Sequence, residues 1–149
     1  MNKQNLNRII PVINEVENGF LCKVRPIVGS GARASVESSE KKEGTYVIHA
    51  PIRSAEVSDS TDYDLTQFYY RALDAASEHA IKEVAFPGIL IEDEDYPIED
   101  SVMVAVVSIS SWMDENPEYG PDVFVVCGRE EVLNAYNDFI RDNIKYEGQ

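Results

Sequence analysis

Apolar residues recur at helical spacing in three segments of the chain. Over Asp62–Ala80 they fall every three or four residues, which gathers them on one face of a helix. The same spacing predicts a second helix from about residue 99 to the Asn116-Pro117 stop signal, and a third over about 130–143. We expect Asp62 or Asp64 to cap the first of these helices.

A short apolar run that is typical of a buried strand precedes each of these helices. The runs are Thr45–Ala50, which Pro51 is expected to end, Glu83–Ile91 and Asp122–Cys127. Strand and helix then alternate along the last two-thirds of the chain. This order predicts three parallel strands, with the helices as right-handed crossovers packed on the sheet.

The first 44 residues have a weaker pattern. Arg8–Val16 and Phe20–Val28 are candidate strands, and Asn18-Gly19 between them is a hairpin turn signal. Pro26 would place the second strand at a sheet edge, because proline has no N–H for a ladder. The segment Gly29-Ser30-Gly31 is typical of a turn, and Arg33 beside it adds only a weak signal for phosphate binding.

Length and composition indicate one globular domain. The chain has 149 residues, of which 44% are hydrophobic and 27% charged, and no apolar run approaches the roughly 20 residues of a membrane span. The N-terminal residues 1–8 are polar and do not resemble a signal peptide, so we expect a cytoplasmic protein. Cys22 and Cys127 have apolar neighbours and are expected to be buried free thiols, and His49 and His79 have no partners at zinc-ligand spacing.

The net charge of −14 is unevenly distributed. Residues 1–53 carry eight basic and five acidic residues, whereas residues 54–149 carry five basic and 22 acidic residues. No Lys or Arg occurs from Glu83 to Gly128. Such a chain should be repelled by nucleic acid and by anionic membranes. We therefore expect neither as a partner, and we expect no metal and no cofactor.

Four segments together resemble the macro domain, the ADP-ribose-binding module of the Appr-1″-p processing family. They are TYVIHAP (Thr45–Pro51), FYYRALDAASEHAIKEVAFPGI (Phe68–Ile89), Tyr96-Pro97 and DVFVVCGREEVLNAYNDFI (Asp122–Ile140). The resemblance implies a three-layer α/β/α fold with a mostly parallel sheet. It implies a single domain over residues 1–149, with a macro-like core at 31–143 and a divergent segment at 1–30.

The resemblance fails where the family binds the pyrophosphate. After the Phe-Pro strand the family has small residues, usually Ser-Thr-Gly, then an aromatic residue and a glycine, so that backbone N–H groups approach the phosphates. Here the same interval contains Leu90, Ile91 and the acidic run Glu92–Asp95 before Tyr96. We expect this acidic loop to lie at the carboxyl edge of the sheet and to disfavour a diphosphate. The run lacks the spacing and glycine of a calcium loop.

The ribose-handling part of the family is also missing. Hydrolysing macro domains hold the distal ribose with an Asn and a glycine-rich loop, and neither Asn14 nor Asn18 can be matched to that Asn. We therefore assign no catalytic residue and consider an enzyme less favoured. The expected function is a binding module that holds ADP-ribose or a related nucleotide weakly. The alternatives are an acidic interaction or inhibitor protein that binds a basic protein surface and, less favoured, an ADP-ribosyl hydrolase.

The candidate ligand-binding residues follow two of the expected strands, since ligands of open α/β sheets bind at the carboxyl ends of strands. A short N-terminal region could also leave a sheet edge uncovered, which makes a homodimer an open alternative. The candidate residues are Gly88, Ile89, Leu90, Ile91, Glu92, Tyr96, Gly128 and Arg129.

Overall fold

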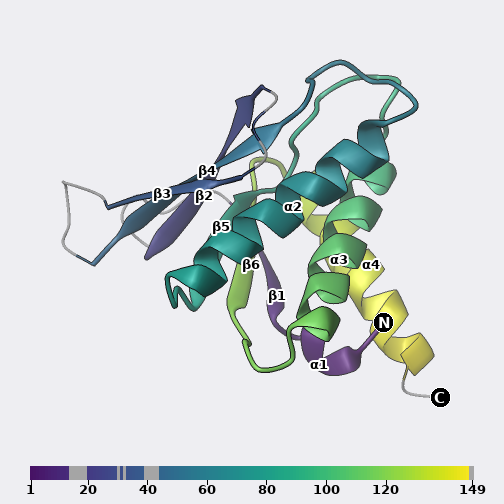
Figure 1. Ribbon diagram of the computed structural model, residues 1–149. Helices are drawn as coiled ribbons and strands as arrows, with labels where there is room; N and C mark the ends of the chain where they lie inside the picture. The colour runs from purple at the N-terminus through teal and green to yellow at the C-terminus, as the bar shows by residue number, and fades with distance from the viewer. Residues whose placement is uncertain (14–19, 30, 32, 39–43, 148–149) are drawn as a thin grey trace.

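The computed structural model describes residues 1–13, 20–29, 31, 33–38 and 44–147. Its strands form a six-stranded sheet in the order β1-β6-β5-β2-β4-β3 (Figure 1). The strands are β1 (Ile9–Ile13), β2 (Cys22–Val28), β3 (Ser35–Ser38), β4 (Tyr46–Ile52), β5 (Glu83–Pro87) and β6 (Asp122–Cys127). The helices are α1 (Lys3–Leu6), α2 (Thr61–Glu78), α3 (Ile98–Glu115) and α4 (Glu130–Glu147).

The predicted α/β fold with a mostly parallel sheet is confirmed. Every neighbouring pair of strands is parallel except β3–β4, which is antiparallel. Strands β5 and β6 run in parallel register from the pair Glu83 and Asp122 onward, and α3 is the crossover between them. None of the helices in the described part of the chain is long and apolar enough to cross a membrane.

Several predicted boundaries shift. Strand β4 continues through Pro51, which pairs in register with Ile27 of β2, so Pro51 does not end it. Strand β5 ends at Pro87, earlier than expected, because the chain then turns away towards α3. Helix α4 is longer than expected, and α2 begins after Ser60, without a capping side chain. Neither Asp62 nor Asp64 is the N-cap of α2, because both lie inside the helix, after the N-cap position Ser60. The carboxylate of Asp62 instead accepts a hydrogen bond from the hydroxyl of Tyr96.

The predicted N-terminal hairpin is wrong. Strand β1 pairs with β6, and β2 lies between β5 and β4, in both cases parallel. Pro26 therefore lies in an interior strand. The sheet tolerates it because β2 pairs with β5 only at Lys23 and Ala85, and the two strands have separated by the position of Pro26. The predicted turn at Asn18-Gly19 lies outside the described residues.

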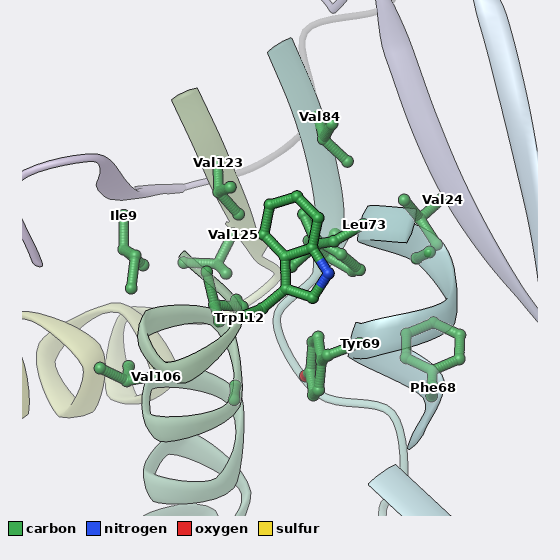
Figure 2. Packing of buried hydrophobic residues seen from close by; sticks show 14 of the residues in the cluster. Ile9, Val24, Phe68, Tyr69, Leu73, Val84, Val106, Trp112, Val123 and Val125 are labelled. Carbon is green, nitrogen blue, oxygen red and sulfur yellow. The ribbon is translucent and has the colours of Figure 1, made fainter. Parts of the chain in front are cut away.

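The three long helices pack on one face of the sheet, where the core lies (Figures 1 and 2). Along β6, Val123 and Val125 point into this core (Figure 2), and Cys127 belongs to the same buried cluster. Trp112 of α3 lies over them, and its indole Nε1 donates a 2.8 Å hydrogen bond to Asp74 of α2. This arrangement fixes the helices that follow β4, β5 and β6, and hence the loops at the carboxyl edge.

The opposite face of the sheet carries no helix among the described residues, so these residues form a sheet with one helical layer rather than the expected three layers. The alternate residues of β6, Phe124 and Val126, point to this side and stay partly exposed. Phe20, which precedes β2, packs on it with its ring centroid 5.1 Å from that of Phe124. Much of this face thus remains open to solvent near β2.

Candidate functional site

The acidic loop lies at the carboxyl edge of the sheet, as expected. It follows β5, while Gly128 and Arg129 follow the parallel strand β6, so both segments meet at one edge. Together with the start of α3 they enclose a cavity of about 420 Å³, here called the rim pocket. Its lining residues are Ile89, Ile91, Glu92, Asp93, Glu94, Tyr96, Pro97, Ile98, Ser101, Arg129 and Glu131.

The rim pocket is strongly acidic. Of its described lining residues, four carry carboxylates and one, Arg129, carries a guanidinium. That guanidinium lies 3.9 Å from a carboxylate oxygen of Glu92 and 3.9 Å from one of Glu131. These long, exposed pairs are weak, but they direct this guanidinium to carboxylates of the protein. An incoming phosphate would meet a net negative charge.

The backbone of the acidic loop is directed inward. The N–H of Asp95 donates a 2.9 Å hydrogen bond to the carboxylate of Asp93, and the N–H of Tyr96 donates to the carbonyl of Asp93 at 3.0 Å. The hydrogen bonds of these two amides form a turn within the loop. The two amides are therefore not available to cradle a phosphate in this conformation.

Tyr96 forms a buried wall of the rim pocket. Its hydroxyl donates a 2.7 Å hydrogen bond to Oδ1 of Asp62, at the start of α2. Burial, and then the neighbouring Asp62 carboxylate, hold the pKa of Tyr96 well above its ordinary value. The hydroxyl is a neutral donor already used by the protein, so Tyr96 offers a ligand chiefly its ring.

Five of the candidate residues meet in the rim pocket: Ile89, Ile91, Glu92, Tyr96 and Arg129.

The other three candidates have different surroundings. Gly88 is buried: its N–H donates to Val126 O at 2.8 Å, and its carbonyl accepts a 2.7 Å bond from the hydroxyl of Tyr136. Leu90 packs against the hydrophobic core, and Gly128 lines a second cavity between β2 and β5. Ile98, Ser101 and Glu131 were missed by the sequence analysis, because only the packing of two helix starts against the loop brings them here.

The histidines contact groups of the protein itself, and the two cysteines are buried free thiols. His49 Nε2 lies 3.1 Å from a carboxylate oxygen of Glu37 on β3, and His79 Nδ1 lies 3.0 Å from the carbonyl oxygen of Ala75. Burial raises the pKa of Cys22 to about 12 and that of Cys127 to about 11, so both stay protonated thiols. Within the described ranges, no three His, Cys, Asp or Glu side chains cluster so that they could hold a metal ion.

The link between β2 and β3 is short. Only residues 29–34 separate the two strands, and those that the structure describes form no helix. Asn14 and Asn18, the two asparagines considered for ribose binding, lie outside the described residues. Among the described residues, we therefore still assign none as catalytic.

A mostly parallel sheet with helices packed on it and a pocket at its carboxyl edge defines the class of α/β proteins. Within that class, residues 24–105 match the model of the macro domain, which is more than half of the chain. The chain belongs to the macro-domain family.

Known proteins similar to the chain agree with this. A macro domain-containing protein of Listeria monocytogenes is 29% identical over 115 residues, which cover 74% of this chain and 64% of that protein. An ADP-ribose glycohydrolase of Mus musculus is 28% identical over 97 residues, covering 64% of this chain and 30% of that protein. The chain thus spans less than two-thirds of either relative.

Solved structures share the fold. The Oceanobacillus iheyensis macrodomain with MES bound superimposes with a TM-score of 0.73 at 17% identity, covering 91% of this chain and 92% of that one. The Trypanosoma brucei macrodomain in complex with ADP-ribose gives a TM-score of 0.74 at 13% identity, covering 92% and 71%. At such identities the likeness extends to the fold alone.

Proposed function

We propose that this chain is a macro-domain binding module whose site for the phosphates of ADP-ribose is impaired and which carries no catalytic residue. The observation that carries the proposal is the charge of the rim pocket, with four carboxylates against one guanidinium. Membership of the family and the ADP-ribose complex of a structural neighbour support a nucleotide as the ancestral ligand.

The repulsion between the carboxylates of the rim pocket and a phosphate can be given a magnitude. Two like unit charges about 4 Å apart repel by about 4 kcal/mol at an effective dielectric near 20. Solvent and salt reduce this repulsion at the exposed loop, but a diphosphate in the rim pocket would be repelled by several carboxylates at once. Arg129 offsets part of this repulsion only by leaving Glu92 and Glu131. Weak or absent binding of ADP-ribose follows.

The absence of catalysis is proposed from the link between β2 and β3 and from the contacts of the two histidines. The short link 29–34 leaves little chain for a glycine-rich ribose loop between β2 and β3. The acid-base candidates do not compensate, since His49 contacts Glu37 and His79 contacts the backbone of its own helix. The glycohydrolase activity in the name of the Mus musculus relative is therefore not extended to this chain.

Calorimetry with ADP-ribose tests the proposal. The wild type should give no heat, or a Kd in the millimolar range, and replacing Glu92, Asp93, Glu94 and Asp95 with Gln or Asn should tighten binding about tenfold by removing repulsion. The matched control removes four exposed carboxylates at the opposite edge of the sheet and should leave the affinity unchanged. Its positions are Glu78, Glu118, Asp122 and Asp142.

Two results would contradict the proposal. One is micromolar binding of ADP-ribose by the wild type, which would mean that backbone amides overcome the carboxylates. The other is release of ADP-ribose from an ADP-ribosylated protein by the wild type above the level of a buffer blank.

The exposed acidic loop favours one alternative, an interaction protein that binds a basic protein surface. Glu92 and its acidic neighbours through Asp95 are all exposed. Such a complex should be recovered by pull-down at low salt, lost at high salt and absent for the loop-neutralised variant. A complex that survives high salt unchanged would exclude this electrostatic mode.

A further inference from the structure

Strands β2 and β5 separate after a single registered pair and leave a cleft on the open face of the sheet. They pair only at Lys23 and Ala85. The resulting cavity, here called the strand cleft, has a volume of about 450 Å³. Its lining residues are Phe20, Lys23, Val24, Arg25, Pro26, Ala85, Phe86, Pro87, Val126 and Gly128.

The walls of the strand cleft are mostly apolar. Pro26 comes from β2 and Pro87 from β5, and neither has an N–H that the separated strands would leave unpaired. Val24 and Phe86, both buried, belong to the core side of the same strands. The ring of Phe20 forms a further wall. Cavities of 300–1,000 Å³ with apolar walls and a few polar groups are typical of small-molecule sites.

Two charged residues are found among the described residues that line the strand cleft, Lys23 and Arg25, and both are basic. No ion pair joins the exposed Arg25 guanidinium to an acid in the ranges that the structure describes. In a chain with a net charge of −14, this guanidinium places a positive charge beside an apolar slot.

We propose that the strand cleft binds a small planar organic anion, such as an aromatic carboxylate, sulfonate or phosphate. The ring lies between Pro26 and Pro87, next to Phe20, and the anionic group is held by Arg25, whose planar fork suits an oxyanion. This goes beyond the proposed function, since both the cavity and the ligand class differ from the rim pocket and ADP-ribose.

A fluorescence titration with anilinonaphthalene sulfonate tests the proposal, with N-phenylnaphthylamine as the neutral analogue that lacks the sulfonate. The wild type should bind the sulfonate at least fivefold more tightly than the neutral dye, and rising salt should weaken only the sulfonate. Arg25→Gln should weaken sulfonate binding about tenfold, and Arg25→Lys should restore part of it. Arg141→Gln, the same charge change on the far part of α4, should have no effect.

Several results would overturn the proposal. They are equal affinity of Arg25→Gln and wild type, equal affinity for the two dyes, or no sulfonate binding by a wild type whose circular dichroism and cooperative melting show a native fold. Loss of sulfonate binding in Arg129→Gln but not in Arg25→Gln would move the anion to the rim pocket. The outcome is independent of ADP-ribose calorimetry, so the two proposals can fail separately.

Discussion

The rim pocket and the strand cleft are nearly equal in volume and opposite in charge. They share the ends of β5 and β6: Pro87 and Gly128 line the cleft, whereas Ile89 and Arg129 line the rim pocket. Among the described lining residues, the cleft has two cations and no carboxylate, and the rim pocket has four carboxylates and one cation. Volume therefore does not distinguish the ligands that these cavities can take, and charge does.

The two cavities also have different causes. The rim pocket depends on the acidic loop, whose carboxylates can be changed without disturbing a strand. The strand cleft depends on the separation of β2 from β5, which Pro26 and Pro87 accommodate. Substitutions should therefore affect one cavity without the other, except at the residues between them.

Gly88→Ala should have the largest effect, because Gly88 lies between Pro87 of the cleft and Ile89 of the rim. An added Cβ would lie 2.8 Å from the carbonyl oxygen of Val126, which accepts the hydrogen bond from the N–H of Gly88. We expect a loss of about 1–3 kcal/mol in the free energy of unfolding, as for other overpacked sites. Denaturant unfolding measures it. Gly128→Ala, whose Cβ would meet no atom within 4 Å, is the control and should be nearly neutral.

Tyr136→Phe comes next, since its hydroxyl is buried and donates to the carbonyl of Gly88 at 2.7 Å. The variant leaves that carbonyl without this donor, and we expect a loss of about 1–2 kcal/mol. Thermal and denaturant melts of the variant provide the measurement. If its stability equals that of the wild type, Gly88 is fixed by strand packing alone.

Tyr96→Phe changes only the rim side. Loss of the hydrogen bond to Asp62 should cost about 1 kcal/mol at neutral pH. The ordinary tyrosine pKa near 10 applies to the unfolded chain, and the folded pKa of Tyr96 is higher, so above pH 10 the unfolded state binds fewer protons and wild-type stability falls as pH rises. In the variant this fall should be less steep. Denaturant melts across alkaline pH test it, and equal slopes would show that Tyr96 ionises normally in the folded protein.

Much of the fold could be predicted from the sequence, because local patterns of apolar residues indicate most of its helices and strands. Helices α2, α3 and α4 each repeat apolar residues at helical spacing, and β6 is a bounded apolar run. The N-terminal strands could not be placed, since the Asn18-Gly19 turn signal is local while the partners of β1 and β2 lie elsewhere in the chain. No local sequence pattern indicates which strands β1 and β2 pair with.

The candidate site can likewise be divided into features that local sequence patterns predict and features that depend on distant contacts. The position of the acidic loop at the sheet edge could be predicted, because the order of strands and helices along the sequence indicates it. The structural role of Gly88 depends on the Val126 carbonyl and Tyr136, and the strand cleft depends on where β2 leaves β5. These are contacts between distant segments, so sequence patterns alone did not reveal them.

Arg129→Gln should have the smallest effect and separates the two cavities most sharply. Arg129 is exposed and its ion pairs with Glu92 and Glu131 measure 3.9 Å, so its removal should change the free energy of unfolding by less than about 0.5 kcal/mol. It should make the rim pocket still more repulsive to phosphate while leaving the cleft and its Arg25 intact. Arg25→Gln is the matched variant, also expected to be neutral for stability, because the guanidinium is exposed and lies outside the core. Denaturant melts of both variants measure this, and a loss above 1 kcal/mol in either would mean that its arginine supports the fold rather than the charge of its cavity.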